Sequence, residues 1–422
     1  MTTPSMRFLS SSLHSVRTAV LVVAVLFALT IACGQAVPAQ TFSVLHNFTA
    51  GSDGADPWGG LTIDAAGNLY GTASYGGNST NCEGGCGTVF KLAQRNSNWT
   101  FSPLYSFSKS DGAYPEGRLI FGHDGKLYGT TGQGGMPNNG QCETDGCGII
   151  FAMQPPATFC PSVTCYWTER VLYEFTGGNS DGSRPTGDTA FDSSGNLFGT
   201  AYEISGTVWE LSPAGGGWNF TAIHNFSELD ALNPYGGVVL DSAGNIYGET
   251  EFGGSLNKGA TYELQYPSWT ETNLHNFNGT DGDRPLGGMV LDANGNLYST
   301  TNRGGANGGG GQVYTLTNSG GNWTLTDIAS FAGFSGPWGN ILMDHAGNIY
   351  GTTVQDGAYS FGSVFKLMPS GGGYTLTTLH DFNGQDGAYP HGAIVMDASG
   401  NLYGTATAGG PHNQGVVWEI TP

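Results

Sequence analysis

The chain has 422 residues, 33 of them acidic and 13 basic, and its formal net charge is −20 at pH 7. Such an acidic surface repels phosphate groups, which argues against binding to nucleic acid or to an anionic membrane surface. Its 71 glycines, its 12% of aromatic residues and its low content of charged residues, 11%, are typical of an all-β protein with many tight turns.

Residues 1–39 have the layout of a secretory signal peptide. Two arginines precede an apolar run at 19–29, and small residues lead to a cleavage site after Ala39. The run is shorter than the roughly 20 residues of a membrane span, and no second run follows, so no membrane span is predicted. We expect a secreted, periplasmic or cell-surface bacterial protein. Lipid anchoring through Cys33 is a lesser alternative, because the segment before it is a poor lipoprotein box.

Residues 40–422 are predicted to form a single domain made of one tandem repeat. The phrase Asp-x-x-Gly-Asn-Leu-Tyr-Gly-Thr, with small variations, recurs seven times. Its aromatic residues are Tyr70, Tyr128, Phe198, Tyr247, Tyr298, Tyr350 and Tyr403. They are 49 to 70 residues apart, and an insertion at 155–165 explains the longest spacing.

Each unit predicts four short antiparallel strands, because residues alternate with period two and no helical period competes. In the first unit these strands are 61–63, 68–72, 88–92 and 99–107. Asp-x-x-Gly-Asn predicts a hairpin turn between the first two strands, with the Asp accepting backbone N–H groups. The residue after the motif aromatic is glycine in six units and Ser299 in the fifth, which indicates crowded packing or a β-bulge.

Beyond the predicted signal peptide, the cysteines form three closely spaced pairs. They are Cys82 with Cys86, Cys142 with Cys147, and Cys160 with Cys165. An even number of paired cysteines in an exported chain indicates local disulfides. A zinc site made by the first two pairs is the alternative, but their spacings lack the two-residue gap usual for zinc ligands.

The two ends of the domain complement each other. The last unit ends after its third strand at 416–420, whereas residues 41–48 have the pattern of a fourth strand that lacks the other three. We therefore predict that the last blade consists of 392–421 together with 41–48, which leaves no open sheet edge in the ring. Seven units of four antiparallel strands predict an all-β fold, a seven-bladed β-propeller.

These motifs resemble the Gloeo/Verruco (GloVer) tandem repeat of exported bacterial proteins. The resemblance covers nearly all of 40–422 and is weakest in the second unit, where Gly122 replaces the motif Asp. It implies a propeller-type repeat and brings no established catalytic residues. A looser likeness links the turns to NHL-type and gluconolactonase-type propellers.

Few residues indicate chemistry. The motif aspartates occur once per blade and cannot converge on a calcium ion, so turn capping is the better interpretation. The histidines that share one repeat position in the fourth strand are interpreted as perimeter residues; they are His46, His224, His275 and His380. No nucleophile elbow, zinc-helix or phosphate-loop motif is present, so we predict no catalytic residue, no metal ligand and no cofactor.

The loops that precede the first strand of each blade carry the best binding candidates. Their side chains should surround the mouth of the central channel: Trp58, Tyr114, Arg184, Tyr235, Arg284, Trp338, Tyr389 and His391. Aromatic rings, carboxylates and two arginines suit a glycan or a protein loop. The structural alternative is that proline stiffens these loops and the aromatic rings pack on neighbouring blades.

We therefore expect a monomeric, non-catalytic binding or scaffold propeller that recognises a carbohydrate or an extracellular protein. The alternative is a metal-dependent enzyme of lactonase or lyase type, which would need three or four oxygen or imidazole ligands converging in the channel. A stoichiometric divalent ion in protein purified without chelator would favour the enzyme.

Overall fold

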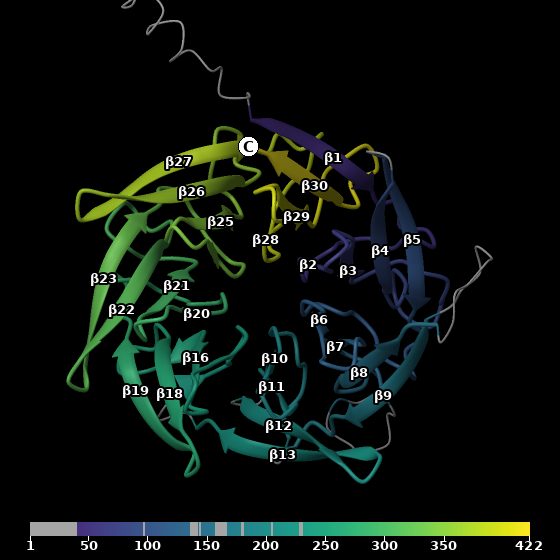
Figure 1. Cartoon of the computed structure of the whole chain (residues 1–422), viewed down its shortest axis with the longest axis horizontal. Coiled ribbons are helices and arrows are strands. Elements are labelled where there is room, and N and C mark those ends of the chain that lie inside the picture. Colours follow the sequence, from purple (N-terminus) through teal and green to yellow (C-terminus); the bar gives the residue numbers. More distant parts are fainter. Residues whose placement is uncertain are drawn as a thin grey trace, which may run out of the picture. The chain divides into compact units, whose positions relative to one another are not determined.

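The computed structural model describes residues 40–95, 98–135, 142, 145–156, 167–178, 181–203, 206–227 and 231–422. Within it, Phe42–Thr421 forms one compact unit, a ring of seven four-stranded antiparallel sheets (Figure 1). The predicted all-β, seven-bladed β-propeller is therefore confirmed. The predicted signal peptide and Cys33 lie outside the described residues, and so do Cys160 and Cys165 of the third predicted disulfide.

The blades follow one another in chain order, and each blade runs from the axis outwards. Blade one has β2 (Leu61–Ile63), β3 (Leu69–Ala73), β4 (Thr88–Arg95) and β5 (Asn98–Ser106). Blade two has β6 (Ile120–Phe121), β7 (Leu127–Thr131), β8 (Ile149–Gln154) and β9 (Thr168–Glu174). Blade three has β10 (Ala190–Phe191), β11 (Leu197–Ala201), β12 (Thr207–Ala214) and β13 (Gly217–Asn225). Blade four has β15 (Val239–Leu240), β16 (Ile246–Thr250), β18 (Ala260–Gln265) and β19 (Thr270–Asn276).

The remaining blades repeat the pattern. Blade five has β20 (Val290–Leu291), β21 (Leu297–Thr301), β22 (Gln312–Ser319) and β23 (Asn322–Ser330). Blade six has β24 (Leu342–Met343), β25 (Ile349–Thr353), β26 (Ser363–Ser370) and β27 (Gly373–Asp381). Blade seven has β28 (Val395–Met396), β29 (Leu402–Ala406), β30 (Val416–Thr421) and β1 (Thr41–Asn47). A small extra sheet on blade four pairs β14 (Ala231–Leu232) with β17 (Phe252–Gly253).

The amino-terminal strand closes the ring. β1 lies beside β30 as the outermost strand of blade seven, as the two incomplete chain ends predicted (Figure 1). The Phe48 N–H group donates a hydrogen bond of 3.0 Å to the Gly415 carbonyl, and the Phe48 side chain is fully buried. Phe42 stacks on His380 of blade six, and His46 stacks on Phe101 of blade one. β1 thus connects both neighbouring blades.

Each hairpin turn between the first two strands is held by its aspartate. The Asp64 carboxylate accepts two backbone N–H bonds of 2.9 Å, one from Asn68, and a bond of 3.0 Å from the Tyr70 hydroxyl. The same pair of backbone N–H bonds is accepted by Asp192, Asp241, Asp292, Asp344 and Asp397. In the second unit, where Gly122 stands at the position of the motif aspartate, Asp124 accepts a hydrogen bond of 3.0 Å from the Tyr128 hydroxyl. The aspartates act within their own turns, because every one of these bonds is local.

The core lies between the blades. Among the described residues, each pair of neighbouring blades shares one buried apolar cluster, such as that of Phe90 with Tyr403. The small residue of the second strand makes room for a third-strand ring, since a Cβ on Gly71 would lie 2.6 Å from the Phe90 ring. Gly71 pairs with Phe90 in an unbroken strand register, so crowding by the ring, rather than a β-bulge, explains the small residue at this position. The bulge lies between the third and fourth strands.

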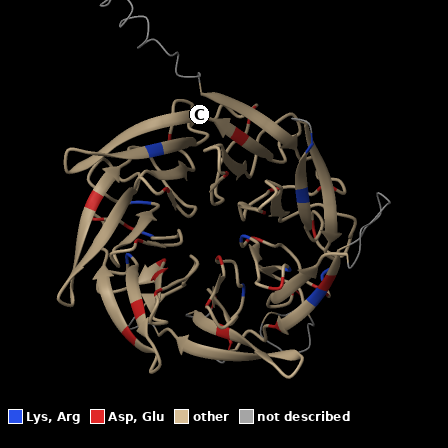
Figure 2. Ribbon diagram, in the orientation of Figure 1, with Lys and Arg blue, Asp and Glu red and all other residues tan. Residues whose placement is uncertain are grey.

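Charged residues are sparse and spread over all the blades (Figure 2). Several charged residues form ion pairs at the perimeter. The fourth-strand histidines, which were predicted to be perimeter residues, are among the groups that pair there. His46, His275 and His380 each lie 3.2 Å from an aspartate of the following loop, and His224 lies 3.1 Å from Glu271. Within the described part of the chain, no helix has the length and apolar character needed to cross a membrane.

Candidate functional site

The loops on one face of the propeller carry the varied side chains. The strands of a blade, numbered one to four from the axis outwards, alternate in direction. The turns that join strands 1 and 2 and strands 3 and 4 therefore lie on one face, and the loops 2–3 and 4–1 lie on the other. A 4–1 loop joins the last strand of one blade to the first strand of the next. We call the face with these longer connections the loop face.

Every 4–1 loop contains a proline that defines two repeat positions. The pre-proline residues are Asp56, Tyr114, Arg184, Asn233, Arg284, Gly336 and Tyr389. The post-proline residues are Trp58, Glu116, Thr186, Tyr235, Leu286, Trp338 and His391. All the pre-proline residues except Gly336 have φ between 53 and 58°. This left-handed conformation is uncommon without glycine, and its repetition shows that it belongs to the scaffold.

The post-proline residues converge on the central channel. All seven line a narrow space of about 40 Å³, which is room for little more than a water molecule. Trp58 stacks on His391 with ring centroids 4.0 Å apart, and Trp338 meets both rings edge-on at 6.0 and 5.2 Å. Tyr235 completes this cluster at 6.0 Å from Trp338. The rings therefore fill the channel mouth instead of surrounding an open one.

His391 is neutral at physiological pH. Burial lowers the pKa of its imidazole to about 4, although a backbone hydrogen bond to Tyr389 acts in the opposite direction. Nδ1 lies 2.9 Å from the Tyr389 carbonyl oxygen. Because a carbonyl only accepts, Nδ1 carries the proton and Nε2 is left as an acceptor.

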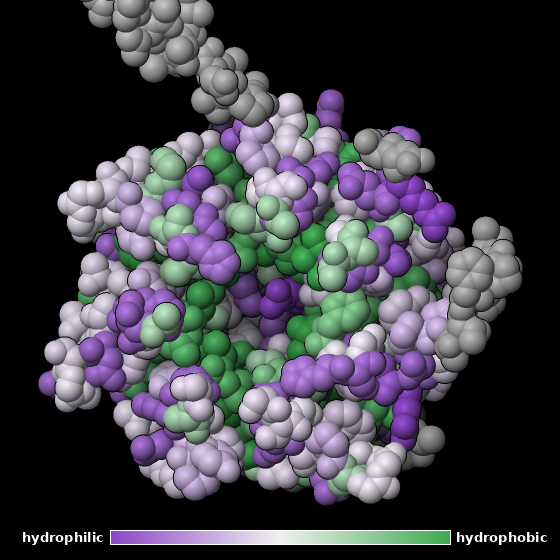
Figure 3. Space-filling model, viewed as in Figure 1, coloured by the Kyte–Doolittle hydropathy of each residue, from purple (hydrophilic) through white to green (hydrophobic). Residues whose placement is uncertain are grey.

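Below this cluster the channel is constricted by backbone and crossed by polar side chains. A glycine follows each post-proline residue, and a Cβ on Gly59 would lie 2.6 Å from the Gly117 carbonyl of the next blade. Arg118 Nε donates to Asp188 Oδ2 at 2.9 Å, and Asn340 Nδ2, from three blades further on, donates to the same oxygen at 2.7 Å. The space-filling view shows a central hollow with apolar residues around it and hydrophilic residues at its base (Figure 3).

A large cavity lies beside the channel, over blades one to three. It measures about 580 Å³, within the usual range of small-molecule sites of about 300–1,000 Å³. We call it the main cavity. Its walls are Tyr75, Asn81, Cys82, Glu83, Gly84, Lys109, Tyr114, Glu116, Gly132, Gln133, Asp145, Arg184, Thr186 and Tyr202. It therefore combines three tyrosines with paired charges.

Hydrogen bonds and ion pairs fix the long side chains of the main cavity. Arg184 Nε lies 3.0 Å from Glu203 Oε1, and its Nη1 donates to the Tyr202 hydroxyl at 3.3 Å. Lys109 Nζ lies 3.4 Å from Asp145 Oδ1. The side chains of Lys109 and Arg184 are 32% and 40% exposed, so these pairs orient the groups more than they stabilise the fold.

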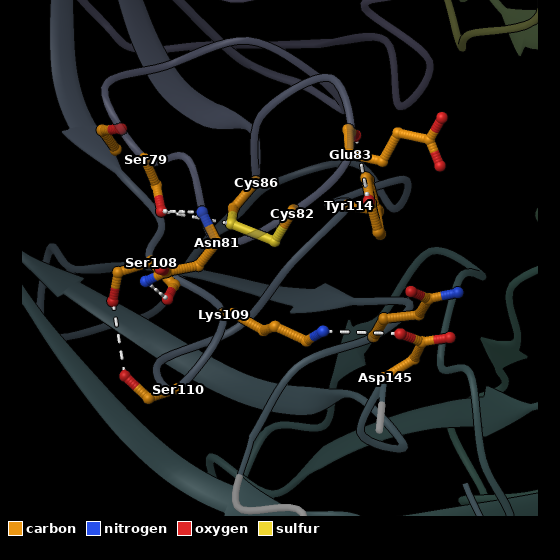
Figure 4. The surroundings of a disulfide bond; sticks show 12 residues. Ser79, Asn81, Cys82, Glu83, Cys86, Ser108, Lys109, Ser110, Tyr114 and Asp145 are labelled. Atoms are coloured by element: carbon orange, nitrogen blue, oxygen red, sulfur yellow. Dashed lines mark hydrogen bonds and ion pairs between the residues drawn. A yellow bond between two sulfur atoms is a disulfide. The ribbon is translucent and has the colours of Figure 1, made fainter. Parts of the chain in front are cut away.

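Two disulfides hold the loops that form the wall. Cys82–Cys86 and Cys142–Cys147 are bonded, which confirms two predicted pairs and rules out the zinc alternative for these four residues. In Figure 4 the loop of the first disulfide lies against Tyr114, whose hydroxyl donates to the Glu83 carbonyl at 3.1 Å.

The third predicted disulfide is not confirmed. Its two cysteines, Cys160 and Cys165, fall in the insertion of blade two, between the described residues 145–156 and 167–178. The bond between Cys160 and Cys165 therefore stays a prediction from their spacing.

The bonded cysteines also bind the backbone of the next blade. The N–H group of Tyr114 donates to the Cys86 carbonyl at 3.0 Å, and that of Arg184 donates to the Cys147 carbonyl at 2.9 Å. The equivalent bond of Arg284 goes to Lys258 and that of Tyr389 to Phe361, so the bond belongs to the repeat, and in blades one and two its acceptor residue is also disulfide-bonded.

Two carboxyl groups near the main cavity have raised pKa values. Burial raises the pKa of Glu116 to about 7. The charge of Arg184 acts to lower this pKa, and the charge of Asp56 acts to raise it. Burial raises the pKa of Asp56 to about 6. Glu116 lines both the main cavity and the channel, so near neutral pH it can donate or accept a hydrogen bond at their junction.

The structure divides the eight predicted site residues into three groups. Four form the channel cluster, Trp58, Tyr235, Trp338 and His391. Tyr114 and Arg184 line the main cavity. Arg284 instead pairs with Glu251 at 3.5 Å and covers the Phe252 ring, and the Tyr389 ring packs against Phe361. Neither Arg284 nor Tyr389 lines the channel space or the main cavity.

Sequence reasoning missed Glu116, Tyr75 and Tyr202. Aligning the 4–1 loops on their prolines would have found Glu116, because it occupies the same position as Trp58 and His391. The two tyrosines lie in 2–3 loops. Tyr75 precedes a Gly-Gly pair that recurs in four other blades and could have marked its position, whereas Tyr202 precedes no such pair.

Among the described residues, no group of three or more His, Cys, Asp or Glu side chains is placed to hold a metal ion.

Fold and loop face together define a repeat-built seven-bladed propeller with a closed channel and a lateral, disulfide-bordered cavity. The chain belongs to the Gloeobacter/Verrucomicrobia repeat family, whose repeat model matches residues 24–239, 203–340 and 239–422. No curated protein sequence matches the chain at a significant level.

Solved structures share the fold. The chain is similar to PorZ, a bacterial surface component of the type-IX secretion system of Porphyromonas gingivalis, with a TM-score of 0.51 and 14% identity over 87% of this chain and 46% of that one. It is also similar to an extracellular domain from B. thetaiotaomicron, with a TM-score of 0.53 and 10% identity over 89% of this chain and 40% of that one. A gluconolactonase from Xanthomonas campestris gives a TM-score of 0.39 and 14% identity over 60% of this chain and 75% of that one. At these identities the likeness to the first two structures concerns the fold alone, and nothing is inferred from the third.

Proposed function

We propose that the protein is an exported glycan-binding propeller and that the main cavity is its binding site. The observation that carries the proposal is the composition of that cavity, in which tyrosine rings stand beside an arginine and a lysine held by ion pairs. Tyrosine rings offer flat apolar surface to a sugar ring, and the polar groups offer hydrogen bonds to its hydroxyls. The disulfides and the predicted signal peptide support export.

The shape of the site favours a glycan over a protein partner. The main cavity is concave and of small-molecule size, whereas a protein interface buries about 800 Å² on each partner. The acidic composition favours a neutral glycan, because polyanionic chains would be repelled.

The repeat supplies matched control variants for the test. Tyr389 and Arg284 occupy the same pre-proline position as Tyr114 and Arg184, with the same backbone conformation, but lie in blades outside the main cavity. Glycan-array screening of the mature chain, followed by calorimetry with any glycan bound, should show that Tyr114→Ala and Arg184→Ala each weaken binding at least tenfold, roughly the effect of a binding hot spot. Tyr389→Ala and Arg284→Ala should bind like the unsubstituted chain.

Equal losses from both pairs would reject the main cavity as the site. The ligand would instead be a protein if two results came together. No glycan on the array would bind, and the chain would capture an extracellular protein in a way that Arg184→Ala abolishes.

Acid–base catalysis at Glu116 is the second candidate function. A carboxyl group with a pKa near 7 in the wall of the main cavity can transfer a proton at neutral pH. Release of new reducing ends or unsaturated sugars from a bound oligosaccharide, abolished by Glu116→Gln while binding is retained, would establish an enzyme. Unchanged oligosaccharide after prolonged incubation would leave a binding protein.

A further inference from the structure

A second cavity on the loop face adjoins the main cavity at the seam where the ring closes. It measures about 450 Å³, and we call it the seam cavity. Its walls are Ala50, Ala55, Asp56, Tyr75, Gly84, Thr407, Ala408, Asn413 and Gln414. They come from three segments: the loop between β1 and β2, the loop between β3 and β4, and the loop between β29 and β30. The seam cavity therefore exists only because β1 joins blade seven.

Tyr75 separates the two cavities. Tyr75 and Gly84 line both of them, so the cavities are neighbours on either side of one tyrosine. The Tyr75 side chain is 41% exposed, and its ring centroid lies 5.1 Å from that of Tyr114. Its backbone pairs with Ala55, which fixes its position at this boundary. An exposed, anchored ring between two cavities is a platform over which a chain of linked rings can pass.

One wall residue of the seam cavity, Asp56, has a carboxylate oxygen that lacks a hydrogen-bond partner. Asp56 Oδ1 is buried, and no hydrogen-bond donor within the described residues reaches it. The backbone N–H of Asp56 donates to the Gln414 carbonyl at 2.9 Å, so the residue itself is fixed. A buried acceptor without a donor is costly, and sugar hydroxyl groups are donors of the right kind.

We propose that the main cavity and the seam cavity are adjacent subsites of one groove, and that the ligand is a neutral oligosaccharide that crosses Tyr75 with at least one sugar unit in each cavity. Asp56 accepts hydroxyl hydrogen bonds in the seam cavity. The inference rests on the proposed glycan-binding function and specifies its ligand as a chain rather than a single sugar.

The experiment is calorimetry of the mature chain with cello-, manno-, xylo- and chito-oligosaccharides of increasing length, starting from the monosaccharides. For the series that binds, affinity should rise with length until both cavities are filled. Asp56→Ala should keep the affinity for the monosaccharide but lose about tenfold for the longer chains. Tyr75→Ala should remove the length dependence.

Asn233→Ala is the matched control for Asp56→Ala. Asn233 has the same left-handed pre-proline conformation but lines neither cavity, so its substitution should leave the length series unchanged. A monosaccharide that binds as tightly as every longer chain would overturn the two-subsite groove while leaving the proposed function intact. If no oligosaccharide binds here or on the array, both proposals fall together.

Discussion

The two faces of the propeller differ in how they use the same repeat. On the face of the 1–2 turns, six of the seven units place an aspartate in the same position, with the same hydrogen bonds to its own turn. On the loop face, the residues before and after the loop proline vary from blade to blade, as Asp56, Tyr114 and Arg184 illustrate, although a few residue types occur twice. The comparison teaches that the constant half of the repeat builds the scaffold and the varied half builds the site. Substitutions on the two faces should therefore change different properties.

Loss of the closing strand should have the largest effect. A mature chain that lacks residues 40–48 loses the outer strand of blade seven and the contacts of Phe42, His46 and Phe48 with blades six, one and seven. We expect the melting temperature to fall by about 10 °C or more. Calorimetric scanning measures the change, and a synthetic peptide of residues 40–48 should restore part of it. An unaltered melting temperature would show that ring closure does not stabilise the fold.

Glu249 should make stability depend on pH. This side chain stands where the six other blades have threonine, and it is buried between blades four and five, where it accepts hydrogen bonds from Ser299 and Tyr314. Burial raises the pKa of Glu249 to about 8, although these hydrogen bonds act in the opposite direction. The folded chain therefore keeps a proton that the unfolded chain loses above its ordinary pKa of about 4.3.

The free energy of unfolding should accordingly fall by up to about 1.4 kcal/mol per pH unit as the pH rises from about 4.5 towards 8. Denaturant titrations at pH 5 and pH 7.5 measure this dependence. Glu249→Gln should flatten it, whereas Glu83→Gln, at an exposed position, should leave it unchanged. A slope that survives Glu249→Gln would assign the effect to other carboxyl groups.

Removing one turn cap should lower stability without altering recognition. Asp292→Ala deletes the acceptor of two backbone N–H bonds of 2.8 Å, those of Asn294 and Asn296, at a cost of about 1–2 kcal/mol. Tyr114→Ala, on the other face, should cost stability much less and should abolish most glycan binding. Paired measurements of unfolding free energy and glycan affinity test this, and a single variant that strongly changed both would contradict the division of labour between the faces.

The disulfides should produce the smallest change in stability. Cys82→Ser with Cys86→Ser opens a ring of only a few residues, so we expect the free energy of unfolding to fall by no more than about 2 kcal/mol. Glycan affinity should fall several-fold, because the loop that supports Tyr114 loses its constraint. Calorimetry under oxidising conditions measures both quantities. Unaltered affinity would mean that the Tyr114 backbone bond to residue 86 suffices without the bridge.

Much of the fold could be predicted because a repeat states the same information seven times. The motif fixed the number of blades, the turn chemistry and the two half-blades at the chain ends, down to the pairing of β1 with β30. These features depend either on residues that are neighbours within one blade or on the number of repeats and strands along the chain. The crowding at Gly71 was also predictable, although its cause, the Phe90 ring of the same blade, was not.

The site was only partly predictable, because it depends on distances between blades. The proline-centred loops identified residues of the loop face, but did not indicate that Trp58, Trp338 and His391 would pack together from distant parts of the chain. The width of the channel is set by backbone contacts between blades at the glycines that follow the post-proline residues. No local sequence pattern indicates these contacts. The cavities lie between 2–3 loops of unequal length, so the repeat pattern alone does not show that Tyr75 and Tyr202 line one cavity.

Hydrogen–deuterium exchange with and without a bound oligosaccharide tests the central claim most directly. If the loop face over blades one to three is the recognition site, binding should protect the segments around Tyr75–Cys86, Lys109–Glu116 and Arg184–Tyr202. The equivalent loops of blades four to six should exchange at unchanged rates. Protection centred on Arg284 and Tyr389, or spread evenly over all seven blades, would contradict the account.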